Sequence, residues 1–201
     1  MTMRKKLLIT IACLSVVLCT LVTGTLAWLI STSGPIINTF EPSKIMVGIN
    51  ESSDLDLQMV PGKEITKDPA VYLETNIACY VFVEITEDLG AWDETNEGDV
   101  FADYFSYSVE DGWTALDGYP GVYYCNAEED IEGLNVLVDD VITVKGETVT
   151  MAMMQELING GNKPTLTFTA YAIQSENLPY GEATEESAKA LVAWNILNGN
   201  N

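Results

Sequence analysis

Two of the four cysteines are the residues of this chain whose type and placement most directly indicate chemistry; the other two, Cys13 and Cys19, lie within the first thirty residues. Cys79 and Cys125 each lie in a strand-like segment rich in apolar and β-branched residues. In an exported chain, two cysteines are typical of one disulfide, which over a loop of this length would stabilise the fold by about 4 kcal/mol in the chain-entropy model. The alternative is two buried thiols that never meet, and the sequence leaves both open.

Acidic clusters offer a second chemistry, because carboxylates are the hard oxygen ligands that calcium prefers. The densest cluster contains Asp93, Glu97 and Asp99. None of the acidic stretches has the spacing of an EF-hand, and a run of charges is usually a solvated surface. Calcium is therefore the one metal that the sequence leaves open, and no other cofactor is predicted.

Histidine is absent from the chain. Its absence removes the commonest zinc ligand and the usual general base near neutral pH, and with them a zinc hydrolase and a Ser-His-Asp triad. A glycosidase needs only two carboxylates, but no spacing singles out a pair. We therefore expect a protein that is not an enzyme.

Aromatic residues in a glycine-rich, acidic stretch carry a binding hypothesis. The residues are Trp92, Trp113, Tyr119, Tyr123 and Tyr124. If exposed, they could stack on the sugars of a wall or matrix polysaccharide, whereas in β-proteins such residues more often pack in the core or across strands. The alternative function is thus a secreted carbohydrate- or ligand-binding β-sandwich module at the cell surface.

The first thirty residues have the features of a secretory leader. Three basic residues precede an apolar run from Leu7 to about Ile30, and small residues stand at Thr25 and Ala27. This pattern predicts a signal peptide over residues 1–27, cut between Ala27 and Trp28. The competing interpretation is an uncleaved anchor, because the run reaches the roughly 20 residues that span a bilayer. In either case the rest of the chain works outside the cytoplasm, and the leader is its only membrane contact.

Cleavage makes the charge balance more acidic, since the leader contains three cations and no acid. Six cations then face 30 acids, which gives a net charge of −24. A surface of this kind repels nucleic acid and anionic membranes and keeps an exported protein soluble.

The 174 residues from 28 to 201 suit one domain, and the sandwich expected over residues 44–201 must position these side chains. Short apolar runs bounded by Gly, Pro, Asn or Asp predict an all-β antiparallel sandwich. The expected strands are 45–49, 71–73, 78–85, 101–109, 121–125, 136–144 and 166–173. Residues 150–158 could form a helix or a strand. Residues 184–198 have an N-cap, an apolar face and a terminal glycine, which predict a helix docked on the domain or on a partner.

Several short segments resemble the TasA and camelysin (CalY) family of exported proteins of Gram-positive bacteria. They occur in the same order along most of the chain: Gly24-Thr25-Leu26-Ala27-Trp28, Ile37-Asn38-Thr39-Phe40, Ile45-Met46-Val47-Gly48-Ile49, Val60-Pro61-Gly62-Lys63-Glu64 and Cys79-Tyr80-Val81-Phe82-Val83. The resemblance implies a leader cut by a SipW-type signal peptidase and a jelly-roll-like β-sandwich. Camelysin relatives have been labelled metallopeptidases, a label that the absence of histidine argues against.

What the resemblance further implies is a homo-oligomer, a fibre of the biofilm matrix, in which an N-terminal segment of one subunit completes a sheet of the next. The candidate segment is 28–43, whose stretch from Trp28 to Thr39 contains no acid. The apolar residues expected to enter the neighbour are Trp28, Leu29, Ile30, Ile36, Ile37 and Phe40. The alternative is an ordinary first strand folded back on its own domain. A matrix polysaccharide is a further candidate partner.

Overall fold

The computed structural model describes residues 3–6, 8–15, 43–52, 57–95 and 98–199, without the side chains of residues 94–95. The chain divides into two units, Met1–Glu41 and Pro42–Asn201. Residues 3–6 and 8–15 are helical, and within the described ranges no helix combines the length and the apolar character needed to cross a bilayer. The predicted cleavage site and residues 28–42 of the donor segment, with all six of its apolar candidates, lie outside the described residues.

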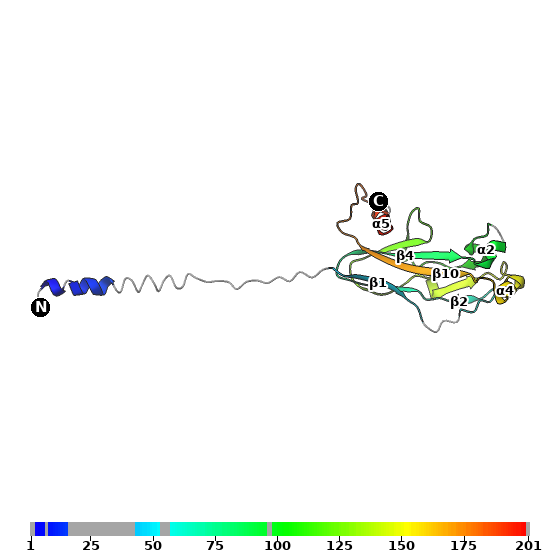
Figure 1. Cartoon of the computed structure of the whole chain (residues 1–201), viewed down its shortest axis with the longest axis horizontal. Helices are drawn as coiled ribbons and strands as arrows, with labels where there is room; N and C mark the ends of the chain where they lie inside the picture. The colour runs from blue at the N-terminus through cyan, green and yellow to red at the C-terminus, as the bar shows by residue number, and fades with distance from the viewer. Residues whose placement is uncertain (1–2, 7, 16–42, 53–56, 96–97, 200–201) are drawn as a thin grey trace. The chain divides into compact units, whose positions relative to one another are not determined.

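The second unit is built mostly of antiparallel strands in three sheets (Figure 1). The first sheet has the order β1 (Ile45–Asn50), β3 (Ala70–Thr75), β8 (Ile131–Asn135). The second has the order β10 (Thr165–Gln174), β4 (Cys79–Asp88), β7 (Val122–Ala127), β6 (Thr114–Ala115). The third has the order β2 (Glu64–Thr66), β9 (Val141–Val144), β5 (Phe105–Ser106).

Helices make the fold mixed α/β, so the expectation of an all-β protein is wrong in this respect. The helices of this unit are α2 (Ala91–Thr95), α3 (Phe101–Tyr104), α4 (Met151–Ile158), α5 (Glu186–Leu197) and the short 3-10 helix η1 (Val138–Asp140). The predicted C-terminal helix over 184–198 is confirmed as α5. The ambiguity at 150–158 is resolved as a helix, whose first turn is capped by Thr150: its Oγ1 accepts a hydrogen bond from Met153 N at 3.3 Å.

The main core lies between the sheets and follows the period-2 alternation of the strands. On β4, Cys79, Val81, Val83 and Ile85 are buried and share one face. They belong to one cluster with buried residues of β3 and β9 and with the inward side chains of β10. Burying one such Val or Leu side chain contributes about 1.5–3 kcal/mol, so this face fixes the strand register.

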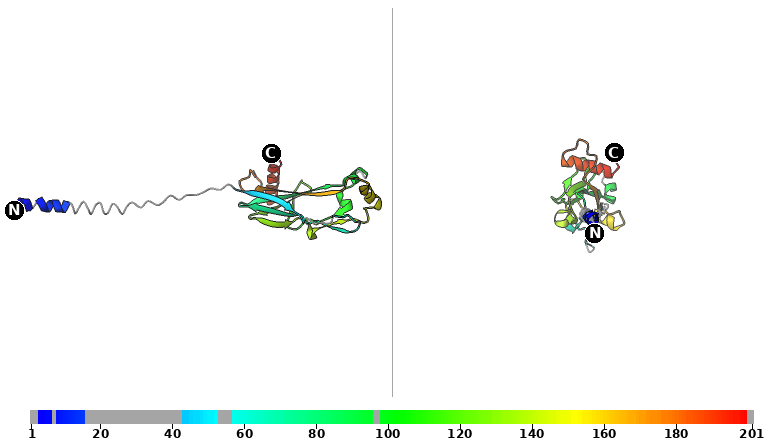
Figure 2. Two further views of the ribbon diagram at one scale, coloured as in Figure 1. Left: turned by 60° about the horizontal axis from the view of Figure 1, so that its bottom comes forward. Right: turned by 90° about the vertical axis from the view of Figure 1, so that its left-hand side faces the viewer.

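A second core covers the opposite face of the β4 sheet. Tyr80 and Phe82 of β4 are buried together with Ala190, Ala193 and Trp194 of α5. The alanines allow the helix to approach closely, and the Trp194 ring centroid lies 5.2 Å from that of Phe82. Figure 2 shows α5 across this face, so the helix docks on its own domain and β4 is covered on both sides.

The expected strand over 101–109 is largely wrong. Phe101–Tyr104 forms the one-turn helix α3, and only Phe105–Ser106 pairs as β5. The Asp103 carboxylate accepts a hydrogen bond from Val100 N at 2.9 Å, which stabilises the start of the turn. The turn stacks the Phe101 ring on the Phe105 ring at 4.5 Å, an arrangement that a continuous strand would not give.

Candidate functional site

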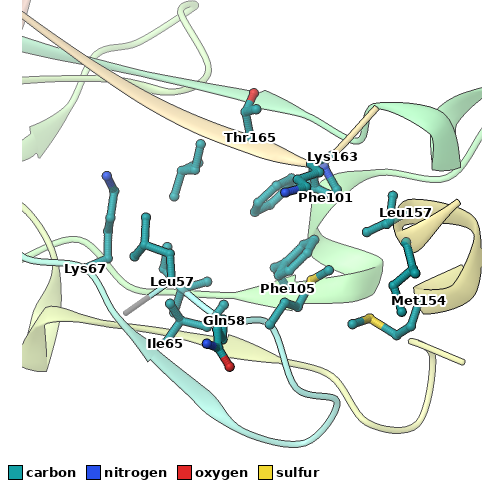
Figure 3. Close-up of a pocket in the computed structure, with 15 residues that line it drawn as sticks. Leu57, Gln58, Ile65, Lys67, Phe101, Phe105, Met154, Leu157, Lys163 and Thr165 are labelled. Atoms are coloured by element: carbon teal, nitrogen blue, oxygen red, sulfur yellow. The ribbon is translucent and has the colours of Figure 1, made fainter. Parts of the chain in front are cut away.

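The described structure contains an apolar cavity of about 820 Å³ (Figure 3). Its walls come from β2, β9, the start of β10, the α3–β5 turn, α4 and residues 57–59. Apolar side chains predominate, and they include Ile65, Phe105, Ile142, Leu157 and Leu166. Six segments, from three separate parts of the sequence, therefore form one space within the range of about 300–1,000 Å³ typical of ligand sites.

Two of the wall strands are edge strands. β2 pairs only with β9, and β10 pairs only with β4. An edge strand leaves one row of backbone N–H and C=O groups without partners in its sheet. The walls of the cavity thus include two edge strands as well as apolar side chains, and an added strand requires an open edge beside an apolar surface.

The rim of the cavity exposes large apolar side chains to solvent. Leu57 is 53% exposed and Ile158, at the end of α4, is 74% exposed, and both line the cavity. Met151, at the start of the same helix, is also exposed but does not line it. Apolar residues at a rim are typical of an interaction site.

Two lysines line the cavity and differ in their surroundings. Lys67 is 14% exposed, forms an ion pair with Glu51, and has its Nζ 5.5 Å from the centroid of the Phe168 ring. Lys163 is exposed, and among the described residues no carboxylate forms an ion pair with it. Figure 3 shows Lys67 at one end of the cavity and Leu157 at the other, with Lys163 nearer to Leu157.

The backbone before Lys163 is held by a close approach at Gly90. Ala91 N donates to Asn162 O at 2.9 Å, and Gly90 has φ of 59°. A Cβ at position 90 would lie 2.5 Å from Asn162 O, so only glycine fits there. The turn after β4 therefore fixes where β10 begins and where Lys163 stands.

The opposite wall is fixed where the chain leaves β1. The Asp68 carboxylate accepts hydrogen bonds from Ser52 N at 3.0 Å and Ser52 Oγ at 2.5 Å. These bonds lower the pKa of Asp68, so the contact persists at neutral pH. Together with the Glu51–Lys67 pair, it anchors the start of the segment that leads to residues 57–59.

The cavity lies at the end of the domain opposite the point where the N-terminal segment joins it. Ile45, the first residue of β1, is in register with Thr75, the last residue of β3. Asn50 is in register with Ala70, on the side of β2. Figures 1 and 2 show the start of β1 and helix α4 at opposite ends. The first residue of β1 therefore lies far from the cavity.

The two cysteines lie on neighbouring strands and point to the same face. Cys79 is in register with Ala127, and Cys125 with Val81, so the cysteines are diagonal neighbours. Diagonal neighbours lie about 7–8 Å apart, and a disulfide usually needs Cα atoms about 4.4–6.8 Å apart, so a bridge requires the strands to shift. Both thiols are free here, and burial raises the pKa of Cys125 to about 11. The disulfide stays a prediction.

The calcium candidates do not come together as a site within the described residues. Asp93 is exposed, Glu97 lies outside the described ranges, and the Asp99 carboxylate accepts a hydrogen bond from the Tyr104 hydroxyl. In the part of the chain that the structure describes, no three acidic or cysteine side chains are grouped as metal ligands would be.

The aromatic residues of the sugar-binding hypothesis mainly pack in the interior, which is the alternative that the sequence also allowed. Trp92, Trp113 and Tyr124 are buried, and Trp113 Nε1 donates to Asn135 O at 2.9 Å. Tyr119 packs edge-on to Trp194. These side chains therefore do not form an exposed platform for stacking on sugars.

The cavity and its two lysines were not singled out in the sequence. Their residues come from six separate segments, and no periodic or local motif joins them. The isolated charge of Lys163 in so acidic a chain is the one signal that could have drawn attention to this end of β10.

Comparison with known proteins adds no relative. No family model, no curated protein and no solved structure matches this chain.

Proposed function

We propose that this protein is an exported structural subunit of an extracellular-matrix or cell-surface fibre. Its sheets then form a jelly-roll-like β-sandwich, and segment 28–43 of one copy adds as a strand inside the cavity of the next. The observation that carries the proposal is the apolar cavity between the edge strands β2 and β10. The resemblance to the TasA and camelysin family supports the same function.

The chemistry of the segment matches that of the cavity. Residues 28–40 contain no charged side chain and include six large apolar ones. Entering the cavity would bury these residues against Ile65, Phe105 and Leu166 and pair their backbone with an edge strand. Removal of the leader before Trp28 is needed, because a free end must thread between the sheets.

The placement of the cavity favours head-to-tail assembly. Because the segment joins the domain at the end opposite the cavity, each copy can donate at one end and accept at the other. Contacts of this heterologous kind generate open filaments unless the rotation closes a ring. A fibre is therefore the natural product of this geometry.

The proposal is tested by comparing the assembly of two proteins, residues 28–201 and residues 41–201. Light scattering and negative-stain electron microscopy monitor the assembly of each. The longer chain should form filaments at a rate that rises with protein concentration, and the shorter one should stay monomeric. A longer chain that remains monomeric at all concentrations would mean that the segment folds back on its own domain, and the fibre proposal would be wrong.

A pair of substitutions on α4 tests the cavity itself. Ile158→Asp places a charge in the cavity rim at an exposed position, so it should block assembly without unfolding the subunit. Met151→Asp on the same helix is the control, because that side chain is equally exposed but lies outside the cavity. Equal assembly of both variants would rule out this cavity as the acceptor.

A further inference from the structure

Segment 28–43 contains one charged residue, and the cavity contains one lysine that forms no ion pair among the described residues. Glu41 is the only charged side chain between residues 28 and 43, and it is also the only acid among the first fifty residues. Lys163 is the cavity lysine that forms no ion pair among the described residues. We infer that Glu41 of one copy pairs with Lys163 of the next and so sets how far the segment enters. This inference rests on the proposed fibre function.

Among the described lysines of residues 43–199, Lys63 also forms no ion pair, but unlike Lys163 it does not line the cavity. Lys67 pairs with Glu51, Lys44 with Glu74, and Lys189 lies 4.0 Å from Glu186. The Lys145 ammonium group donates a hydrogen bond to the Ala102 carbonyl. Lys163 thus presents a cation at the border of an apolar space, in a chain whose surface is otherwise strongly acidic.

The position of Glu41 in the sequence places it at the mouth of the neighbour's cavity. It directly follows Phe40, the last apolar residue of the segment, and directly precedes the domain of its own copy. Drawing an unpaired carboxylate into an apolar cavity is strongly unfavourable, so insertion stops where Glu41 meets solvent. Lys163 is exposed and stands toward the α4 end of the cavity, where an incoming segment from a head-to-tail neighbour would cross the rim.

The pair also explains how one register would be selected. A strand that slips by one residue turns its side chains to the opposite face, and a slip by two either buries Glu41 or withdraws Phe40 from the cavity. An exposed ion pair contributes little affinity by itself, so its main effect is to favour the register in which both charges are satisfied.

Charge reversal tests the inference in the chain from Trp28 to Asn201. Lys163→Glu should raise the critical concentration for assembly at least about fivefold, because two carboxylates then meet at the rim. Lys63→Glu is the matched control: Lys63 is exposed, does not line the cavity, and changes the net charge equally. Glu41→Lys alone should also impair assembly, and the double variant Glu41→Lys with Lys163→Glu should restore it to within about twofold of the parent.

The outcomes separate this inference from the proposal on which it rests. If the parent assembles while Lys163→Glu and Lys63→Glu have the same critical concentration, the ion pair is wrong and the fibre proposal stands. The same conclusion follows if the double variant does not restore the critical concentration of the parent. If the parent does not assemble, both are overturned. Circular dichroism and the melting temperature of each variant show whether the subunit is folded.

Discussion

At the scale of single residues, Glu186 connects the start of α5 to the sheet beneath it. Its carboxylate accepts hydrogen bonds from the Asn126 amide and from the Tyr80 hydroxyl, the latter at 2.6 Å, and Lys189 lies 4.0 Å away. The bonds from Asn126 and Tyr80 lower the pKa of Glu186. Burial, and then Glu186, raise the pKa of Tyr80. The ionised glutamate is therefore the form that the fold prefers.

Glu186→Gln should make this preference visible as a pH dependence of stability. Because the folded-state pKa of Glu186 lies below its unfolded value of about 4.3, its contribution is fully present above that value and is lost as the pH falls through the folded-state pKa. We expect the variant to be less stable by about 1 kcal/mol near neutral pH. The free energy of unfolding, measured by urea titration at several pH values, checks this.

Subtracting the free energy of unfolding of Glu186→Gln from that of the parent protein removes the contribution of the other acids, because they titrate alike in both proteins. The difference in stability should shrink below about pH 4, where the parent also becomes protonated. A difference that stays constant down to about pH 3 would show that the side-chain shape, and not the charge, is what α5 requires.

At the scale of elements, α5 is held to the sheet mainly by one aromatic side chain. The Trp194 ring lies 5.2 Å from Phe82 and 5.3 Å from Tyr171, measured between ring centroids. Trp194→Ala should therefore lower the free energy of unfolding by about 3–5 kcal/mol, since the cavity left between helix and sheet cannot close completely.

The control for this prediction is Val192→Ala on the same helix. Val192 lies outside the buried cluster, so its truncation should cost less than about 1.5 kcal/mol. Urea unfolding followed by tryptophan fluorescence and by circular dichroism measures both variants. If both variants lose a similar amount of unfolding free energy, packing against Phe82 does not hold α5 in place.

The elements that the sequence predicted correctly are those with a clear local pattern. Alternation over 78–85 and 166–173 corresponds to β4 and β10, and segment 184–198 corresponds to α5, although Glu185 occupies the N-cap position and its side chain makes no capping hydrogen bond. β8 was missed because Ile131–Asn135 has a glycine and few apolar residues, and it becomes a strand only by pairing with β3. The α3 turn was missed because ring stacking outweighs the strand preference of its aromatic residues.

The candidate site was less predictable than the fold. The sequence identified residues 28–40 as a segment without charge, but it could not indicate the cavity, whose walls come from six segments. Tertiary packing alone brings Ile65, Phe105, Leu157 and Leu166 together. The exposure of the aromatic stretch was left open for the same reason, because whether Trp92 and Trp113 are exposed depends on what α3 and β8 place over them.

At the scale of the whole molecule, charge opposes the association that the cavity favours. The chain from Trp28 onward has a net charge of −24. The described residues contain three ion pairs, so most acids are left to solvent. Subunits joined end to end therefore repel one another, and the repulsion must be offset by apolar burial at the joint.

Assembly should consequently become faster and more complete as salt is added. The Debye length falls from about 30 Å at 0.01 M to about 8 Å at 0.15 M, which screens repulsion between whole subunits. The same salt weakens the pair between Glu41 and Lys163, but one exposed pair contributes at most about 1 kcal/mol, so the net effect should follow the repulsion. The critical concentration of residues 28–201 in sodium chloride is the quantity to measure, with the melting temperature of residues 41–201 as the control for subunit stability. A critical concentration that rises with salt would show that attraction between charges, and not burial of segment 28–43, drives the joint.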